Sequence, residues 1–194
     1  MLGAIGLVLL AAVVLLVIII ATRPDRFRYE RRATIAAPAS VIFGLLNDFH
    51  QWTRWSPWEG RDPSMTRTHA GAPSGSGAVY SWVGNSKVGE GRMTITESQP
   101  SQRIAIKLEF IKPWTATNLT EFTLKPISGG SDVNWAMSGS YNFMAKAFSL
   151  FMNMDKLIGK DFEQGLAQLK GVAEMESKGT GVMPAATGPG TLRT

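Results

Sequence analysis

The chain has 194 residues, a length that fits one folded domain with some residues left over. Hydrophobic residues make up 44% and charged residues 18%, and the absence of cysteine excludes disulfides, thiolate nucleophiles and cysteine metal sites. The net charge of +5 is uneven: residues 23–32 carry five arginines and two acids (+3), and residues 33–194 carry 15 basic and 13 acidic groups (+2). A nearly neutral main domain gives no support for nucleic-acid binding, so we expect no nucleic-acid partner.

Residues 2–21 form an uncharged, proline-free run dominated by Leu, Val and Ile. As a helix such a run spans about 30 Å, the thickness of a hydrocarbon core. The sequence therefore predicts a transmembrane anchor over residues 1–22, with membrane contact through residues 2–21. A cleavable signal peptide is the alternative, but no Lys or Arg precedes the run and no A-x-A pattern follows it.

A basic juxtamembrane segment, residues 23–32, follows the apolar run and contains the start of the first strand. Its arginines are Arg23, Arg26, Arg28, Arg31 and Arg32. Positively charged flanks stay on the cytoplasmic side of a membrane, and they attract anionic headgroups. We therefore expect a single-pass protein of the bacterial inner membrane whose folded domain faces the cytoplasm.

Periodicity predicts the first elements of the folded domain. Apolar and polar residues alternate from Tyr29 towards Pro38, which indicates a strand. The next residues, up to Phe49, carry an apolar stripe at helical spacing, and Pro38 is well placed in a first helical turn. The segment WTRWSPW, residues 52–58, follows as a second short helix that should end before Pro57.

A meander of strands is predicted next. Residues 60–76 are rich in Gly, Pro, Ser and Thr, which predicts a loop with one short edge strand near Met65–His69. Alternation then predicts five more strands, in GAVYSWVGN, in GEGRMTITES and over residues 103–110, 120–124 and 133–137.

The last predicted element is one long helix over residues 143–173, because apolar residues recur there at three or four residues. Its first part, FMAKAFSLFMNM, is apolar nearly all round, and its second part is amphipathic. Residues 174–194 are expected to form a disordered tail. The element order predicts an α+β fold in which a curved antiparallel sheet of about seven strands wraps around this helix, with two short helices at one end.

Four segments resemble the SRPBCC superfamily, which includes START domains, and in particular its bacterial polyketide cyclase/dehydrase-type members. They are RRATIAAPASVIFGLLNDFHQWTRWSPW, GNSKVGEGRMTITES, IKLEFIKPW and FMNMDKLIGKDFEQGLAQLK. The resemblance covers about residues 28–173. It implies a helix-grip fold with a hydrophobic cavity between the sheet and the C-terminal helix. Members of this superfamily bind lipids, sterols or polyketides there, and only some are enzymes.

The search for catalytic chemistry yields weak acid/base candidates only. The two histidines, His50 and His69, lack partners at metal-ligand spacing, and no G-x-S-x-G or phosphate-binding glycine motif is present. We therefore expect no metal and no cofactor. If the protein is an enzyme of the cyclase or dehydratase kind, the candidates are His50, Arg54, Tyr80 and Asn118.

The aromatic residues carry the main functional hypothesis, a cavity that binds a hydrophobic or amphipathic small molecule such as a lipid, isoprenoid or polyketide. The expected lining residues are Trp52, Trp55, Trp58, Trp82, Phe110, Phe122, Trp135, Phe148, Phe151 and Met152. Such a stripe is more often plain protein core, and the tryptophans of residues 52–58 could also reach the bilayer interface. An exposed FMAKAFSLFMNM segment would instead indicate a protein-interaction scaffold.

Overall fold

The computed structural model describes residues 2–179 and confirms the predicted α+β architecture. Seven strands form one antiparallel sheet in the order β1-β7-β6-β5-β4-β3-β2. The strands are β1 (Arg26–Ile35), β2 (Thr66–Gly71), β3 (Ala78–Val83), β4 (Glu90–Gln99), β5 (Arg103–Lys112), β6 (Ala116–Ile127) and β7 (Gly130–Ser140). The predicted edge strand is β2, which lies at the end of the sheet opposite β1.

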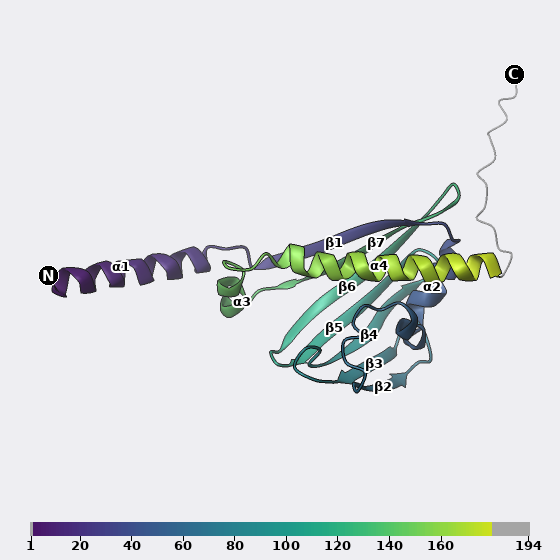
Figure 1. Cartoon of the computed structure of the whole chain (residues 1–194), viewed down its shortest axis with the longest axis horizontal. Helices are drawn as coiled ribbons and strands as arrows, with labels where there is room; N and C mark the ends of the chain where they lie inside the picture. Colours follow the sequence, from purple (N-terminus) through teal and green to yellow (C-terminus); the bar gives the residue numbers. More distant parts are fainter. Residues whose placement is uncertain (1, 180–194) are drawn as a thin grey trace, which may run out of the picture.

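Helices cover one face of the sheet and extend from one end of it. The helix α1 (Leu2–Ala21) projects away from the domain, and α4 (Met154–Gly179) runs along the domain (Figure 1). The helix α2 (Ala39–Asn47) and the 3-10 helix η1 (Phe49–Arg54) are the two predicted short helices. Since α4 contacts β1, α2 and η1, the core lies between α4 and the inner face of the sheet.

The single long helix predicted over residues 143–173 is wrong, because the structure divides it into α3 (Phe143–Phe148) and α4. Asn142 starts α3 by accepting a 2.8 Å hydrogen bond from the backbone N–H of Ala145. Asn153 starts α4 in the same way, by accepting from the N–H of Lys156 at 3.0 Å. Capping by an asparagine side chain satisfies amide groups that have no partner inside the helix, and this favours a new helix start at each site.

The end of the long helix also differs from the prediction. The helix α4 continues to Gly179, so residues 174–179 are helical rather than part of a disordered tail. The remaining residues of the predicted tail, 180–194, lie outside the described residues.

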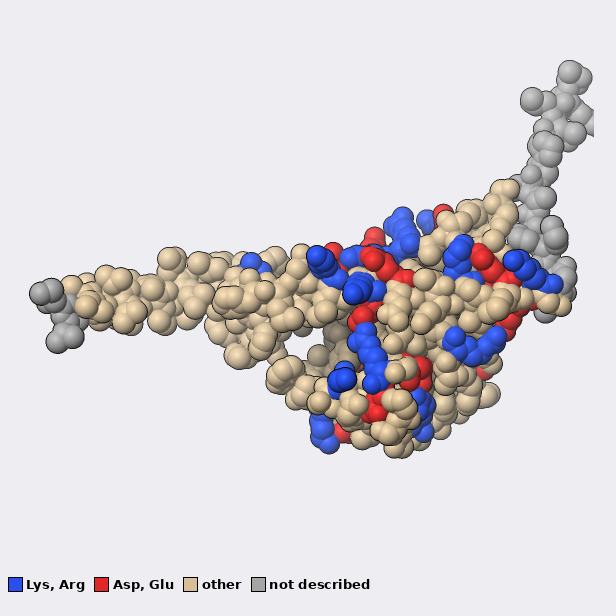
Figure 2. Space-filling model, in the orientation of Figure 1, with Lys and Arg blue, Asp and Glu red and all other residues tan. Residues whose placement is uncertain are grey.

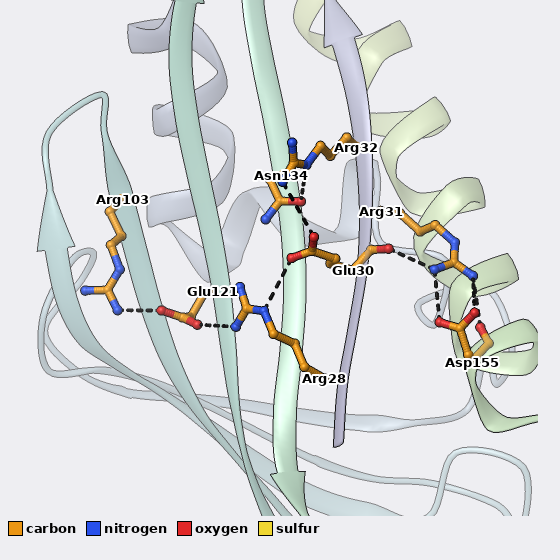
Figure 3. A network of polar contacts seen from close by, with 8 residues as sticks. All are labelled: Arg28, Glu30, Arg31, Arg32, Arg103, Glu121, Asn134 and Asp155. Atoms are coloured by element: carbon orange, nitrogen blue, oxygen red, sulfur yellow. Dashed lines mark hydrogen bonds and ion pairs between the residues drawn. The ribbon is translucent and has the colours of Figure 1, made fainter. Parts of the chain in front are cut away.

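Most arginines of the juxtamembrane segment belong to the sheet rather than to a free basic surface. Arg28 bonds Glu121 at 3.0 Å and Glu30 at 3.3 Å, and Arg103 also bonds Glu121 (Figure 3). The two arginines, Arg103 first, lower the pKa of the Glu121 carboxyl. Arg32 bonds Asn134 at 3.2 Å in the same network. These contacts hold four neighbouring strands together and leave Arg23 and Arg26 as the arginines nearest to α1.

Arg31 points to the other side of the sheet and ties β1 to α4. Its guanidinium lies 3.1 Å from the carboxylate of Asp155 and 2.8 Å from that of Glu163. A Cβ atom at Gly159 would fall 1.9 Å from a guanidinium nitrogen of Arg31, so glycine is needed on α4 for this approach. Asp155 and Glu163 thus pair with β1 and not with the neighbouring lysines of their own helix.

Candidate ligand-binding site

The inner face of the sheet has two halves that differ in packing. One half lies towards the β6–β7 turn and contains the paired residues Phe122 and Trp135. The other lies towards the β5–β6 turn, on the α1 side of the domain, and contains Leu108 and Phe110 (Figure 1). We call these the packed half and the open half.

The packed half is filled by aromatic rings. Trp135, which is 2% exposed, stacks on Phe162 of α4 with ring centroids 4.3 Å apart and planes 8° apart. Phe122 lies against the same indole at 4.8 Å, and Trp55 meets its edge at 5.7 Å. Trp52 completes the group at 4.7 Å from Trp55. These contacts make Trp52, Trp55, Phe122 and Trp135 core residues, although the sequence analysis placed them on a cavity wall.

Trp52 in η1 and Trp55 directly after it have a structural role that the sequence did not predict. Trp52 Nε1 donates to the carbonyl oxygen of Leu46 at 3.0 Å, and Trp55 Nε1 donates to that of Leu45 at 3.1 Å. Both carbonyls belong to the last turn of α2, where helix carbonyls lack partners within the helix. The two indoles therefore terminate α2 and fill the core at once.

In the described part of the chain, the indole N–H of Trp135, unlike those of Trp52 and Trp55, has no hydrogen-bond partner. Within residues 2–179 its Nε1 is the one buried side-chain nitrogen or oxygen that has no hydrogen-bond partner. An unpaired buried N–H costs about 1–3 kcal/mol, so such a group calls for an explanation.

Apolar side chains of the open half stay partly exposed. Cross-strand pairing places Met93 beside Leu108, and Gly91 beside Phe110, on neighbouring strands. All three apolar side chains are only partly buried, as is Ile158 in the early turns of α4. Figure 2 shows a hollow on this side of the domain, next to α3. The packed half has no such exposure.

Trp82 forms a flat part of this surface. A Cβ atom at Gly91 would lie 2.3 Å from the six-membered ring of Trp82, so the indole crosses β4 at the glycine. Its Nε1 donates to Val88 O at 3.0 Å, and Phe110 meets it edge-on at 6.2 Å. A glycine inside a strand is a sequence signal for close approach of another group, and here that group is a site residue.

Polar groups are few in the open half. Asn118 is buried and lies opposite Leu108 on the neighbouring strand β6. Its Nδ2 lies 3.7 Å from the sulfur of Met137. The hydroxyls of Tyr29 and Tyr141 hydrogen-bond each other. Burial, and then the bond to Tyr141, raise the pKa of Tyr29, so the Tyr29 hydroxyl stays protonated. A few polar groups in an apolar surface are typical of sites for amphipathic molecules.

Three of the expected lining residues lie elsewhere. Phe148 is in α3 and Phe151 and Met152 are in the turn that follows, and all three side chains are exposed to solvent. They do not face Trp135 across the interior, because α3 and α4 are separate helices. Trp58 is half-buried beside the packed half, with its ring centroid 5.6 Å from that of Trp135 and 6.4 Å from that of Phe162.

The four acid/base candidates do not form one cluster. His50 stacks on His69 at 4.1 Å, and its Nδ1 lies 2.7 Å from a carboxylate oxygen of Asp48. Arg54 pairs with Glu176 on the surface, and Asn118 lies on the inner face of the sheet.

Tyr80 is part of a separate polar network. Its hydroxyl donates to Glu59 at 2.6 Å, and Arg67 bonds the same carboxylate at 2.6 Å. Burial, followed by the hydrogen bond to Glu59, raises the pKa of Tyr80.

Two surface pockets border these candidates. One has a volume of about 370 Å³ and is lined by Arg54, Glu59, Arg67 and Gln168 among others. The other, about 170 Å³, lies at His50 and His69. Neither pocket is the cavity expected under α4. Within residues 2–179, no group of three or more His, Asp or Glu side chains is placed to hold a metal ion.

The sequence matches one family model. The model of the polyketide cyclase / dehydrase and lipid transport family matches residues 26–174, from the start of β1 to near the end of α4. No curated protein sequence matches the chain.

Solved structures show the same fold at low sequence identity. A protein from Chromobacterium violaceum is 17% identical, with a TM-score of 0.54 over 78% of this chain and 99% of its own. The Aha1 dimer from Colwellia psychrerythraea is 14% identical, with a TM-score of 0.57 over 77% and 97%. The di-domain ARO/CYC protein StfQ from the steffimycin biosynthetic pathway is 10% identical, with a TM-score of 0.58 over 79% of this chain and 52% of StfQ.

Proposed function

This chain belongs to the polyketide cyclase / dehydrase and lipid transport family, and we propose that its domain binds one hydrophobic or amphipathic molecule in the open half of the interior. The ligand class is a lipid, isoprenoid or polyketide-like compound. Trp82, Phe110 and Leu108 would contact its apolar part, and Asn118 would contact a polar group.

The difference between the two halves carries this proposal. Phe122 and Trp135 are fully packed, whereas Met93, Leu108 and Phe110 remain partly exposed on the same face of the sheet. Exposed apolar surface costs about 25 cal/mol per Å², so an apolar ligand that covers these side chains would be bound favourably.

The proposal includes a membrane tether. Residues Gly3–Ala21 have a mean hydropathy of 3.4 and are the one stretch of the described chain that is long and apolar enough to cross a membrane as a helix. A signal sequence passes the same test. Most side chains of α1 are exposed, which argues against the core helix of a soluble domain and fits contact with lipid. Arg23 and Arg26 at its C-terminal end favour a domain on the cytoplasmic side of the bacterial inner membrane.

The first experiment is native mass spectrometry of residues 24–194, purified without detergent, followed by organic extraction. A stoichiometric apolar compound is expected, and its mass would name the ligand class. If nothing co-purifies and a fluorescent fatty acid also fails to bind, the binding function is wrong. Intact-mass analysis of the full chain from membranes tests the tether, because a cleaved signal sequence would leave a chain without residues 2–21.

A second candidate function is a cyclase- or dehydratase-like reaction on a ligand in the same region. One observation favours it. Tyr80 on β3 lies opposite Met93 on β4, and its hydroxyl donates to the largely buried carboxylate of Glu59. Such a tyrosine could transfer a proton to a bound molecule. Once a ligand is identified, Tyr80→Phe should abolish its conversion and leave its binding intact.

A further inference from the structure

The strongest unexplained feature outside the interior is a cluster of exposed apolar side chains on the α1 side of the domain. Its members come from α3, the following turn and the β5–β6 turn, and we call them the apolar patch. They are Trp114, Phe143, Met144, Phe148, Phe151 and Met152. Two of them are especially accessible, Phe151 at 84% and Trp114 at 73%. Exposed aromatic residues in such numbers indicate a surface that another apolar phase covers.

The patch is contiguous across two elements. The rings of Trp114 and Phe148 lie 6.2 Å apart, which connects the β5–β6 turn to α3. Between Phe143 and Asn153 the one charged side chain is Lys146, and no acidic residue occurs. The charged side chains of the molecule gather instead over the sheet and α4 (Figure 2).

The end of α1 is fixed directly beside this patch. Lys146 Nζ lies 3.4 Å from the carbonyl oxygen of Ala21, the last residue of α1, and it also pairs with Asp25. Arg23 donates to the backbone oxygen and the hydroxyl of Ser149, at 3.2 Å each. Near this end Ile20 is buried, and α1 contacts α3.

The linker between α1 and β1 is too short for the apolar patch to lie far from a bilayer that α1 spans. Only residues 22–25 separate α1 from β1. Four residues reach about 14 Å when fully extended, and one headgroup region is about 5–8 Å thick, so β1 begins within about 14 Å of the end of α1. If α1 spans a bilayer, the patch lies at the surface of that bilayer.

From these contacts we propose that the apolar patch docks into the phospholipid bilayer next to α1. Its aromatic and Met side chains enter the boundary between headgroups and acyl chains, about 5–10 Å deep, as interfacial amphipathic segments do. Arg23 and Arg26 lie at headgroup level, where they meet anionic lipids. The proposal rests on the proposed function in one respect, because it requires that α1 span the membrane.

Docking would place the open half of the interior at the lipid surface. The β5–β6 turn carries Trp114 of the apolar patch. Phe110 of the open half lies on β5, the strand that leads into this turn. The hollow seen beside α3 in Figure 2 lies on this side as well. An apolar ligand would then pass from the bilayer to Phe110 and Trp82 without crossing water.

The test uses the natural lack of cysteine. Single-cysteine variants of the full chain carry a nitroxide label at Met144, Phe151, Leu10 or Met175, in vesicles of phosphatidylethanolamine and phosphatidylglycerol. Met175 is the matched control, because it is 68% exposed, close to the 63% of Met144, but lies near the far end of α4. The measurement compares relaxation of each label by oxygen, which enters lipid, with relaxation by a water-soluble nickel complex.

We expect oxygen to act more strongly than nickel on labels at 144 and 151, as at position 10, and the reverse at 175. Labels at 144 and 151 that behave like the one at 175, while position 10 reports lipid, would overturn docking and leave the tether intact. Labels at 144 and 151 shielded from both reagents would show that a protein covers the patch, which also overturns the proposal. A water-exposed label at position 10 would refute the tether and docking together, whatever the ligand measurements show.

Discussion

The packed and open halves of the interior lie on the same face of one sheet and contain similar apolar residue types, yet they differ in how well their side chains are covered. In the packed half, η1 brings Trp52 and Trp55 onto Phe122 and Trp135. In the open half, the beginning of α4 is the main cover, and no tryptophan loop reaches it. The number of elements that meet over the sheet, rather than the apolar character of the sheet, decides which half is filled.

An aromatic residue on the inner face is therefore not by itself a ligand contact. Trp135 and Trp82 both come from inward positions of the sheet, and one is fully buried while the other is partly exposed. Substitutions in each half can separate the two by experiment, and the largest effect is expected in the packed half.

Truncation in the packed half should cost the most stability. Trp135→Ala removes a ring that stacks on Phe162 and contacts Phe122, and we expect a loss of about 3–5 kcal/mol in the free energy of unfolding. Urea denaturation followed by circular dichroism measures this loss. Trp82→Ala is the control from the open half and should lose clearly less; equal losses would mean that the two halves are packed alike.

Two glycines of α4 allow the packing on the two sides of this helix to be compared by adding one methyl group at each. At Gly165 a Cβ atom would lie 2.6 Å from the ring of Trp135 and 3.0 Å from Pro57, so Gly165→Ala overpacks the packed half. We expect a net loss of about 1–2 kcal/mol, after the gain of about 1 kcal/mol in helix propensity. The matched control is Gly171→Ala.

Gly171 is on the exposed side of the same helix, with no atom within 4 Å of the position of a Cβ. Its replacement by alanine should stabilise the protein by about 0.5–1 kcal/mol, because only helix propensity changes. A gain in stability from both variants, measured by thermal unfolding, would show that Trp135 has room to move and that the packed half is not full.

The strands were predictable because their inward and outward residues alternate. Residues 103–110 have this pattern, and in β5 Ile104 and Ile106 are buried while Lys107 is exposed. Alternation also identified Trp82, Phe122 and Trp135 as inward-facing. It could not tell which of them would be covered, because that depends on where η1 lies in space.

The break between α3 and α4 and the pairing of charges were not predictable in the same way. Asn142 and Asn153 cap helices through bonds to the backbone, but an asparagine inside an apolar helical run is only weakly unfavourable and does not force a break. Asp155 has Lys156 and Lys160 close to it in the sequence, yet it pairs with Arg31 of β1. Contacts between segments distant in the sequence determine both features, so the periodicity of a single segment cannot predict them.

The open half should respond to mutation mainly through ligand binding. Phe110→Ala removes a partly exposed ring beside Trp82, and we expect the dissociation constant of a fluorescent fatty acid to rise about tenfold, or about 1.4 kcal/mol. Energy transfer from tryptophan to the probe measures binding. Ile127→Ala is the control, because Ile127 is an exposed apolar residue at the end of β6, near the opposite turn. An unchanged affinity in Phe110→Ala would place the ligand outside the open half.

The smallest effect is expected on the outer face, which should matter for acid stability and not for the interior. The pKa of Glu121 lies below the ordinary glutamate value of 4.5 because Arg103 and Arg28 bond its carboxylate. A lowered folded-state pKa contributes stability at pH values above 4.5, and this contribution is lost as the pH falls from there through the folded-state pKa. The groups are partly exposed to solvent, which limits the contribution to about 1 kcal/mol or less.

Glu121→Gln keeps the shape of the side chain and removes this titration. The natural chain should lose up to about 1 kcal/mol more stability than the variant when the pH is lowered from about 7 to about 3 in urea titrations. Affinity for the fatty acid should be the same in both, because Glu121 lies on the face of the sheet opposite α4. A variant that matched the natural chain in its acid transition would show that the arginine network contributes no net stability. A variant that lost ligand binding would show that the outer face sets the shape of the open half.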